Sequence, residues 1–293
     1  MIKQGLVKTG QMSLGEQAEV EALVTLCREQ DRLELPLYLE SAPPGAICQL
    51  LHYDDDNLVG FASLPPDGDI EVMGMVHPAH RRRGVGRALL AAVREECRRR
   101  GVAEFLMVCE EASASGQAFA GAVGADYRFS EYLMEVEQAA FGQLQPPPKT
   151  VEIRQATGQD LETLVDLWAA SHPEREAERR PMIAQWLQQE KQRFFIGQVQ
   201  GAAVGMLRLH MDAPSVFINS FNVRPEHRRR GYGRQILMAV VERLIAEGWE
   251  YIRLEVATEN RNALSLYYGC GFQEVTAYRY YRLTVYQASK HKL

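Results

Sequence analysis

The sequence predicts a mixed α/β protein made of two tandem domains. The length of 293 residues suits two domains of ordinary size, and each half alternates strand-like and helix-like patterns. A string is also repeated: VHPAHRRRGVGRALL starts at Val76 and VRPEHRRRGYGRQIL starts at Val223, 147 residues later. The same separation links Gly124 to Gly271. One register therefore holds over a long stretch and indicates a domain duplication.

A proline-rich segment marks the expected boundary between the halves. Residues 143–150 read QLQPPPKT, and consecutive prolines neither continue a helix nor lie inside a sheet. We therefore predict a first domain over residues 1–142, a linker over 143–150 and a second domain over 151–293. Upstream of the repeated string the separation falls to 145 residues, as between Gly60 and Gly205, which indicates a difference in loop length.

The elements of the second half follow from apolar periodicity and from cap residues. Asp160 is a candidate helix cap, and Gly248 is a good helix stop. In chain order we expect a strand at 151–157, a helix at 160–172, a hairpin at 194–211, a strand at 218–223, a helix at 234–248, a strand at 251–258, a short helix at 260–272 and a closing strand at 278–286.

The first half repeats this arrangement. We expect a strand at 71–76, a helix at 86–101, a strand at 104–109, a short helix and a strand at 128–137. The strand at 104–109 reads EFLMVC, which is apolar on both faces. Such a strand is typical of a buried position, so we expect burial here rather than a substrate cleft.

Composition excludes several classes of function. The start of the chain has no signal-peptide pattern and no run of about 18 apolar residues occurs, so we expect a cytoplasmic protein without a membrane partner. The five cysteines show no C-x-x-C spacing, which argues against a disulfide framework and against a zinc or other metal site. A net charge of −5 argues against nucleic-acid binding.

The repeated string contains a glycine loop between a strand and a helix. The loop has the form R-x-x-G-x-G in both copies, at Arg81, Gly84 and Gly86 and at Arg228, Gly231 and Gly233. Glycines two apart let successive main-chain N–H groups point outward, and the helix that follows adds its positive end. The loop lacks the third glycine of a dinucleotide fingerprint and the G-K-[ST] of a P-loop. The pattern favours a pyrophosphate site.

These residues resemble the GNAT superfamily of acyl-CoA-dependent N-acetyltransferases, whose signature loop is R/Q-x-x-G-x-G/A. The resemblance spans both halves and implies two tandem domains of that fold, each a mixed, mostly antiparallel sheet flanked by helices. In the family, the loop amides hold the coenzyme A pyrophosphate and the preceding strand pairs with the pantetheine arm.

The resemblance implies acetyl-CoA as co-substrate, an amine-bearing acceptor and no metal. It places coenzyme contacts at Phe221, Asn222, Val223, Arg228, Arg229, Arg230, Gly231, Tyr232, Gly233 and Arg234. The same roles extend to the first copy at Val76, Arg81, Arg82, Arg83, Gly84, Val85, Gly86 and Arg87.

A second family signature occurs only in the second half. LEVATENRNALSLYYGCGF resembles L-E-V-x-x-x-N-x-x-A-x-x-L-Y-x-x-x-G-F, and this resemblance makes Glu255 the general base, Tyr267 the general acid and Asn260 a coenzyme contact. Alternation along residues 251–258 also places Glu255 opposite the apolar face of its strand. Each residue also has another interpretation: Glu255 as a surface carboxylate paired with an arginine, and Tyr267 as a core tyrosine.

The repeat supplies a test of which half is catalytic. The 147-residue separation maps Glu255 to Val108, Tyr267 to Ala120 and Asn260 to Ser113. We therefore expect chemistry only in the second half, unless a gap shifts the short helix.

Several alternatives stay open. The chain could be a non-catalytic acyl-CoA-binding or sensing protein, or an acetyltransferase similar to the mycothiol synthases, which are tandem proteins that acetylate a cysteinyl amine. We expect His80 and His227 to be solvated or capping, and the aromatic set Trp168, Trp186, Phe194 and Phe195 to be core. Residues 171–180, SHPEREAERR, lie where the family places substrate-shaping helices.

Overall fold

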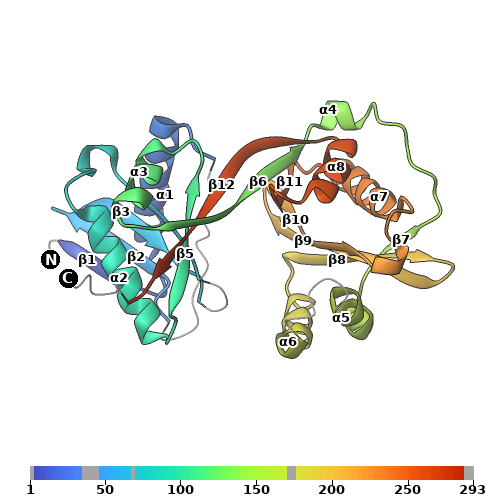
Figure 1. Cartoon of the computed structure of the whole chain (residues 1–293), viewed down its shortest axis with the longest axis horizontal. Coiled ribbons are helices and arrows are strands. Elements are labelled where there is room, and N and C mark those ends of the chain that lie inside the picture. The colour runs from blue at the N-terminus through green and yellow to red at the C-terminus, as the bar shows by residue number, and fades with distance from the viewer. Residues whose placement is uncertain (1–2, 35–45, 67–69, 170–175, 287–293) are drawn as a thin grey trace, which may run out of the picture. The chain divides into compact units, whose positions relative to one another are not determined.

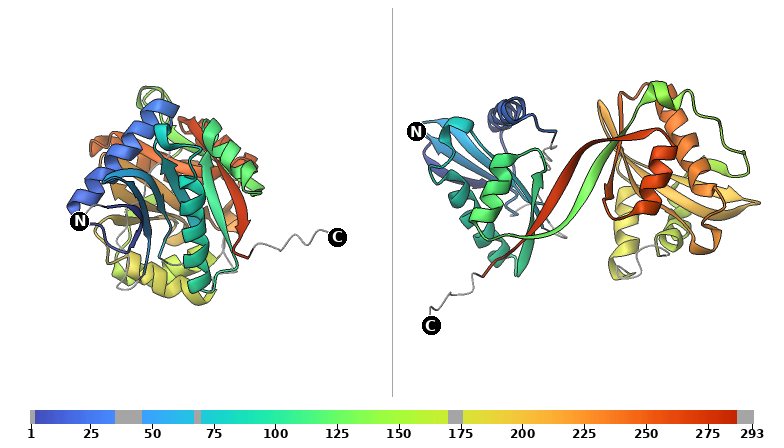
Figure 2. Two further views of the ribbon diagram at one scale, coloured as in Figure 1. Left: turned by 90° about the vertical axis from the view of Figure 1, so that its left-hand side faces the viewer. Right: turned by 45° about the horizontal axis from the view of Figure 1, so that its top comes forward.

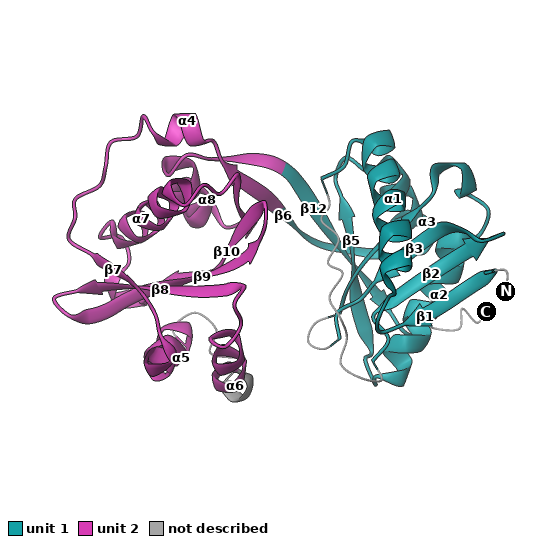
Figure 3. Ribbon diagram, turned by 180° about the vertical axis from the view of Figure 1, so that it is seen from behind, with its two compact units in different colours: residues 1–131, 276–293 teal, residues 132–275 magenta. Residues whose placement is uncertain are grey.

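The computed structural model describes residues 3–34, 46–66, 70–169 and 176–286 (Figure 1). The chain forms two compact units, one of residues 1–131 and 276–293 and one of residues 132–275 (Figure 3). Both units are mixed α/β, which confirms the predicted fold class.

The compact units do not follow the predicted boundaries of 1–142 and 151–293. Strand β12 (Phe272–Thr284) pairs antiparallel with β5 (Glu104–Glu110), with Tyr278 opposite Glu110 and Thr284 opposite Glu104. The expectation that residues 278–286 close the sheet of the second half was therefore wrong. A strand segment belongs to the unit whose main chain accepts and donates its hydrogen bonds. For residues 278–284 this main chain is β5, which comes from the first half of the sequence.

The first unit is a sheet with helices on both faces. Its elements are β1 (Gly5–Thr9), α1 (Leu14–Asp31), β2 (Gln49–Asp54), β3 (Asn57–Ser63), β4 (Glu71–Val76), α2 (Val85–Arg99), β5, α3 (Ala114–Ala122) and the start of β6 (Asp126–Val136). The strand order is β1-β2-β3-β4-β5-β12-β6. Helices α2 and α3 share one apolar core with the sheet, and α1 packs on the other face against β3 and β4.

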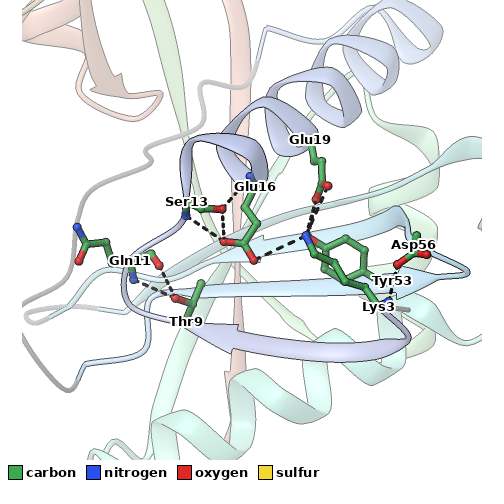
Figure 4. Close-up of polar contacts among 8 residues, drawn as sticks. All are labelled: Lys3, Thr9, Gln11, Ser13, Glu16, Glu19, Tyr53 and Asp56. Atoms are coloured by element: carbon green, nitrogen blue, oxygen red, sulfur yellow. Dashed lines mark hydrogen bonds and ion pairs between the residues drawn. The ribbon is translucent and has the colours of Figure 1, made fainter. Parts of the chain in front are cut away.

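Helix α1 is fixed at its start and along its length (Figure 4). Ser13 accepts the main-chain N–H of Glu16, and Glu16 in turn accepts the N–H of Ser13, which forms a capping box. One turn later, Glu19 accepts the hydroxyl of the fully buried Tyr53 at 2.6 Å, and Lys3 lies 3.1 Å from that hydroxyl. Burial raises the pKa of Tyr53 to about 12.

The second unit is also a sheet between two helical layers. After the end of β6 its elements are α4 (Gln138–Phe141), β7 (Glu152–Gln155), α5 (Leu161–Ala169), α6 (Glu176–Trp186), β8 (Gln192–Val199), β9 (Ala202–Asp212), β10 (Ser215–Val223), α7 (Tyr232–Ala246), β11 (Tyr251–Ala257), α8 (Arg261–Gly269) and the start of β12. The strand order is β12-β6-β11-β10-β9-β8-β7. Helices α7 and α8 lie side by side over one face, and α5 and α6 cover the other (Figure 2).

Each face of the second sheet has its own core. Val204, Leu207 and Leu209 of β9 pack with α7, whereas Met206 packs with α5 and α6. The expected core role of the aromatic set is confirmed: Trp168, Phe194 and Phe195 are buried, and Trp186 is partly buried against the α5 and α6 core. Alternation holds from Met206 to Leu209, and the register shift in the β8–β9 ladder at Val204 places that side chain on the face of α7 as well.

The remaining expectations concern cysteines, metals and helices. All five cysteines are buried and free, as predicted. Within the described ranges, no group of three or more His, Cys, Asp and Glu side chains is placed to hold a metal ion. No helix in the described part of the chain is long and apolar enough to span a membrane. Of the predicted substrate-shaping segment 171–180, residues 171–175 lie outside the described residues, and α6 begins at Glu176.

Candidate active site

The glycine loop has the same backbone in both units. Arg82 and Arg229 have φ values of 63° and 58°, and Gly84 and Gly231 have φ values of 92° and 78°. The two glycines are the N-cap residues of α2 and α7, and no side chain caps either helix. The first N–H groups of both helices are therefore open to an outside acceptor, which is the arrangement that binds anions.

The arginines around the loop divide into anchors and exposed charges. Arg228 donates from Nε to the carbonyl of Val223 at 2.9 Å, and Arg81 donates in the same way to Val76 at 3.1 Å. Arg81 also holds both carboxylate oxygens of Asp31, at 3.0 and 2.7 Å, which raises the pKa of its guanidinium. The first arginine of each loop therefore fixes the turn.

The other predicted arginines are arranged alike in the two units. Arg87 and Arg234 donate to carbonyls at the ends of the next helices, Ala122 in α3 and Gly269 in α8. The following arginines in the loop are exposed, namely Arg82, Arg83, Arg229 and Arg230. These exposed guanidinium groups provide the positive charge beside the open helix ends.

Strands β10 and β11 separate in front of the loop. Their parallel pairing ends at Ile218 opposite Leu254, although β10 continues to Val223 and β11 to Ala257. Residues 222 and 223 of β10 pair with β9 on their other side, at Met206 and Gly205. One edge of the last residues of β10 thus has no strand partner within the sheet and is available to an extended ligand.

The two predicted catalytic residues lie on opposite faces of the second sheet. Glu255 is exposed and is the first residue of β11 beyond its last pair with β10. Its neighbours Leu254 and Val256 pack with α7 and α8, so Glu255 points to the face of α5 and α6. Tyr267 lies in α8 and is 9% exposed.

Tyr267 is held by packing alone. Its ring lies 5.8 Å from that of Phe272, and its hydroxyl makes no hydrogen bond to the described residues. Burial raises the pKa of Tyr267 to about 12, so the phenol is protonated at neutral pH. A protonated, unbonded phenol can donate to a ligand.

Asn260 and Ser113 show that the two halves are aligned without a gap. Asn260 caps α8 by accepting the N–H of Ala263 at 3.2 Å, and Ser113 caps α3 by accepting that of Gly116 at 3.1 Å. Both helices therefore keep the 147-residue separation. The equivalent of Tyr267 in the first unit is the fully buried Ala120.

The first unit contains a cavity of about 500 Å³ beside its own glycine loop. Pairing between β4 and β5 ends at Val72 opposite Met107, and the strands separate beyond that point. Met107, Val108 and Cys109 line the cavity. The expected burial holds for Phe105, Val108 and Cys109, but the strand also borders a cavity, because its ladder with β4 ends at Met107.

Glu110 is a cavity residue that the sequence analysis missed. It is 2% exposed and accepts the main-chain N–H of Glu34 at 2.8 Å and the hydroxyl of Thr276 at 2.8 Å. The signal for it was alternation, which places Glu110 on the same strand face as Val108. Its contacts tie the end of α1 and strand β12 to one side of the cavity.

The loop histidines lie outside these features. His80 Nδ1 lies 3.5 Å from a carboxylate oxygen of Asp54. His227 packs beside Tyr232, with ring centroids 6.2 Å apart. His77 Nδ1 accepts the N–H of Ala79, which caps the short turn before the first loop.

Comparison with known proteins agrees with this geometry. The sequence model of the acetyltransferase (GNAT) family matches twice, over residues 17–124 and 161–272. The chain is 31% identical to a mycothiol acetyltransferase of Clavibacter sepedonicus over 286 residues, which cover 93% of this chain and 91% of that protein. It is 30% identical to a mycothiol acetyltransferase of Thermobispora bispora, over 92% of this chain and 96% of that protein.

Two solved structures share this fold along nearly the whole chain. A tandem GNAT protein from the clavulanic acid biosynthesis pathway superposes with a TM-score of 0.74, at 16% identity, over 99% of this chain and all of that chain (100%). A GCN5-related N-acetyltransferase from Sphaerobacter thermophilus gives a TM-score of 0.72, at 18% identity, over 98% of both chains. With two family matches, a repeated glycine loop and whole-chain similarity to a tandem protein, this chain belongs to the GNAT acetyltransferase family and carries two copies of its fold.

Proposed function

We propose that the second unit transfers an acetyl group from acetyl-CoA to a primary amine. The observation that carries this proposal is the separation of β10 from β11 after Ile218 and Leu254. The free edge of β10 leads directly into the open N-terminus of α7, so one extended ligand could pair with the strand and place its pyrophosphate on the loop. Residues 221–223 and 228–234 would hold that ligand.

The chemistry requires an uncharged amine. An alkylamine has a pKa near ~10 and is mostly protonated at neutral pH, so a base must take its proton. Glu255 is exposed at the gap between the strands and faces α5 and α6. In the proposed reaction Glu255 accepts this proton, directly or through water, and the amine nitrogen attacks the thioester carbonyl carbon.

The carbon–sulfur bond then breaks and the thiolate leaves. A thiol has a pKa of about 8.5, well below the pKa of about 12 for Tyr267. Tyr267 therefore acts as a hydrogen-bond donor that stabilises the thiolate, and full proton transfer would be uphill. Base and acid lie on opposite faces of the sheet, which suits an amine that enters from one face and a thiol that leaves on the other.

Identity of 31% along 93% of the chain to a mycothiol acetyltransferase supports a small-molecule amine as the acceptor. A panel of primary amines, with release of free coenzyme A as the signal, tests the activity. Acetyl transfer to at least one amine is the expected result, and hydrolysis without transfer would refute the proposal.

For the first unit we propose coenzyme binding without chemistry. Its cavity of about 500 Å³ is large enough for part of a coenzyme, and it adjoins Arg81, Gly84 and Gly86 of the loop. Val108 and Ala120 stand where the second unit has Glu255 and Tyr267, so neither a base nor an acid is supplied at those positions. Titration with acetyl-CoA distinguishes one binding site from two.

A further inference from the structure

Arg208 of β9 is a largely buried cation without a carboxylate partner among the described residues. Its Nη1 donates to Gln192 Oε1 at 2.8 Å, and its guanidinium carbon lies 3.9 Å from the ring centroid of Trp186. Its Nε is buried and has no acceptor. Burial lowers the pKa of Arg208 to about 10, so the group keeps its charge at neutral pH. Burying an uncompensated cation is costly for folding alone.

Asn222 of β10 is a second buried polar group without partners. It is 8% exposed, and neither its Oδ1 nor its Nδ2 has a hydrogen-bond partner in the part of the chain that the structure describes. Asn222 lies opposite Met206, and Asn219 lies opposite Arg208. Met206 packs with α5 and α6, so register and alternation put Asn222 and Arg208 on that same face.

This face also carries Glu255. Asn219 of β10 pairs with Arg208 of β9. The last pair between β10 and β11 is Ile218 with Leu254, so Asn219 and Glu255 are the next residues on these two strands. Neighbouring paired strands lie about 4.8 Å apart, and β10 and β11 separate at this point, so Arg208 and Glu255 are at least two strand spacings, or about 10 Å, from each other. An acceptor whose amine reaches Glu255 could therefore extend a second polar group to Arg208.

The first unit serves as an internal comparison. The separation of 145 residues between Gly60 and Gly205 places Ser63 at the position of Arg208. The separation of 147 residues in the repeated string places Met75 at the position of Asn222. Val108 stands there in place of Glu255. The unit without the candidate base thus folds without the buried guanidinium and without the buried amide, so the fold itself does not require them. Their joint presence with Glu255 points to a ligand.

We propose that Arg208 and Asn222 bind a carboxylate of the amine acceptor, so that the acceptor belongs to the class of extended amino acids and short peptides. The buried Nε of Arg208 has no acceptor among the described residues, and the edge formed by Nε and Nη2 matches both oxygens of a carboxylate. Trp186 holds the plane of the guanidinium by stacking. The inference rests on the proposed amine acetylation by the second unit.

The test offers amines in matched pairs, each as the free carboxylate and as its primary amide, for example glycylglycine and glycylglycinamide. For the wild-type protein we expect kcat/KM to be at least about tenfold higher for the carboxylate member, since a bidentate, charge-assisted contact is lost in the amide. Arg208→Gln should bring that ratio close to one, Arg208→Lys should give an intermediate ratio, and Asn222→Leu should lower it.

Arg193→Gln is the matched control. Arg193 lies on β8 and forms an ion pair with Glu247 at 2.7 Å on the opposite side of the sheet, so its loss should keep the wild-type ratio. Thermal unfolding and acetyl-CoA binding verify that each variant is folded. If Arg208→Gln does not fold, Arg208→Lys and Asn222→Leu provide the test.

Three results would overturn the inference in distinguishable ways. Equal use of both members of every pair by the wild-type protein refutes carboxylate recognition while acetylation stands. A preference that survives Arg208→Gln refutes the role of Arg208. Failure to acetylate any amine refutes the proposed function, and the inference falls with it.

Discussion

Tyr267 and Ala120 occupy the same position in two aligned helices. Asn260 and Ser113 cap these helices through the same contact, to the main-chain N–H three residues later. The spacing from Asn260 to Tyr267 equals that from Ser113 to Ala120, so neither helix contains an insertion relative to the other. A phenol in one unit thus corresponds to a methyl group in the other, and this difference separates the roles proposed for the two units.

Tyr267→Phe should reduce kcat about 100-fold, because the leaving thiolate loses its hydrogen-bond donor. Acetyl-CoA affinity should change little, since the Tyr267 hydroxyl has no partner in the described structure. Thiol release and calorimetric titration measure the two effects. The control is Tyr268→Phe, which removes an exposed phenol bonded to Glu274. Wild-type turnover by Tyr267→Phe would contradict the assignment.

Glu255→Gln should lower kcat/KM at neutral pH by about 100-fold, because the amine then has no base. The deficit should shrink as the pH approaches the amine pKa near ~10, where the substrate loses its proton unaided. A pH–rate profile of both proteins checks this. The exposed Glu259 offers a matched Glu259→Gln control. A constant deficit at all pH values would indicate a structural role instead.

Gly231→Ala should weaken both folding and coenzyme binding. Gly231 has a φ of 78°, a conformation that costs an L-residue about 1 kcal/mol. Gly248 ends α7 with a φ of 86°, so Gly248→Ala introduces similar strain away from the loop. Chemical denaturation should show similar losses in both variants. Only Gly231→Ala should raise the Kd for acetyl-CoA, and an equal rise in both would argue against a binding role.

Acetyl-CoA should bind at two sites per chain, one in each unit. Gly86→Leu should reduce the stoichiometry to one, because a Cβ at this position already lies 3.2 Å from the ring of Phe119 and a larger side chain would enter the cavity. Isothermal titration calorimetry measures both values. A wild-type stoichiometry of one, unaffected by Gly86→Leu, would refute coenzyme binding in the first unit.

Asp160→Asn should destabilise the second unit in a pH-dependent way. Arg154 donates to both oxygens of Asp160, at 2.9 and 2.5 Å, and these bonds hold its pKa at about 2. A carboxylate with a lowered pKa adds stability above its unfolded pKa near 4, and this stability is lost as the pH falls toward 2.

The expected loss at neutral pH is about 1–2 kcal/mol, from the bonds to Arg154 and to the N–H of Thr157. Urea unfolding across the acidic range should show the two proteins converge. Asp166→Asn, at an exposed position in α5, is the control. A difference that persists unchanged near pH 2 would mean that the ion pair is not its cause.

The sequence by itself determined the duplication, the fold class and the loop. These features depend on local patterns: a repeated string, apolar periodicity, and glycines at Gly84 and Gly231 that adopt positive φ values in the structure. The same register also aligned Asn260 with Ser113, because no insertion interrupts either helix. Local geometry is encoded within a few residues, so it can be deduced from them.

Only the tertiary structure decided which strands pair and where they part. Nothing in residues 276–284 indicates that they pair with β5, and nothing in EFLMVC indicates that the ladder ends at Met107. The missing partners of Arg208 and Asn222 are likewise invisible in the sequence. Strand pairing and the satisfaction of buried polar groups depend on residues far apart in the chain, and the position of each partner is fixed only when the whole unit has folded.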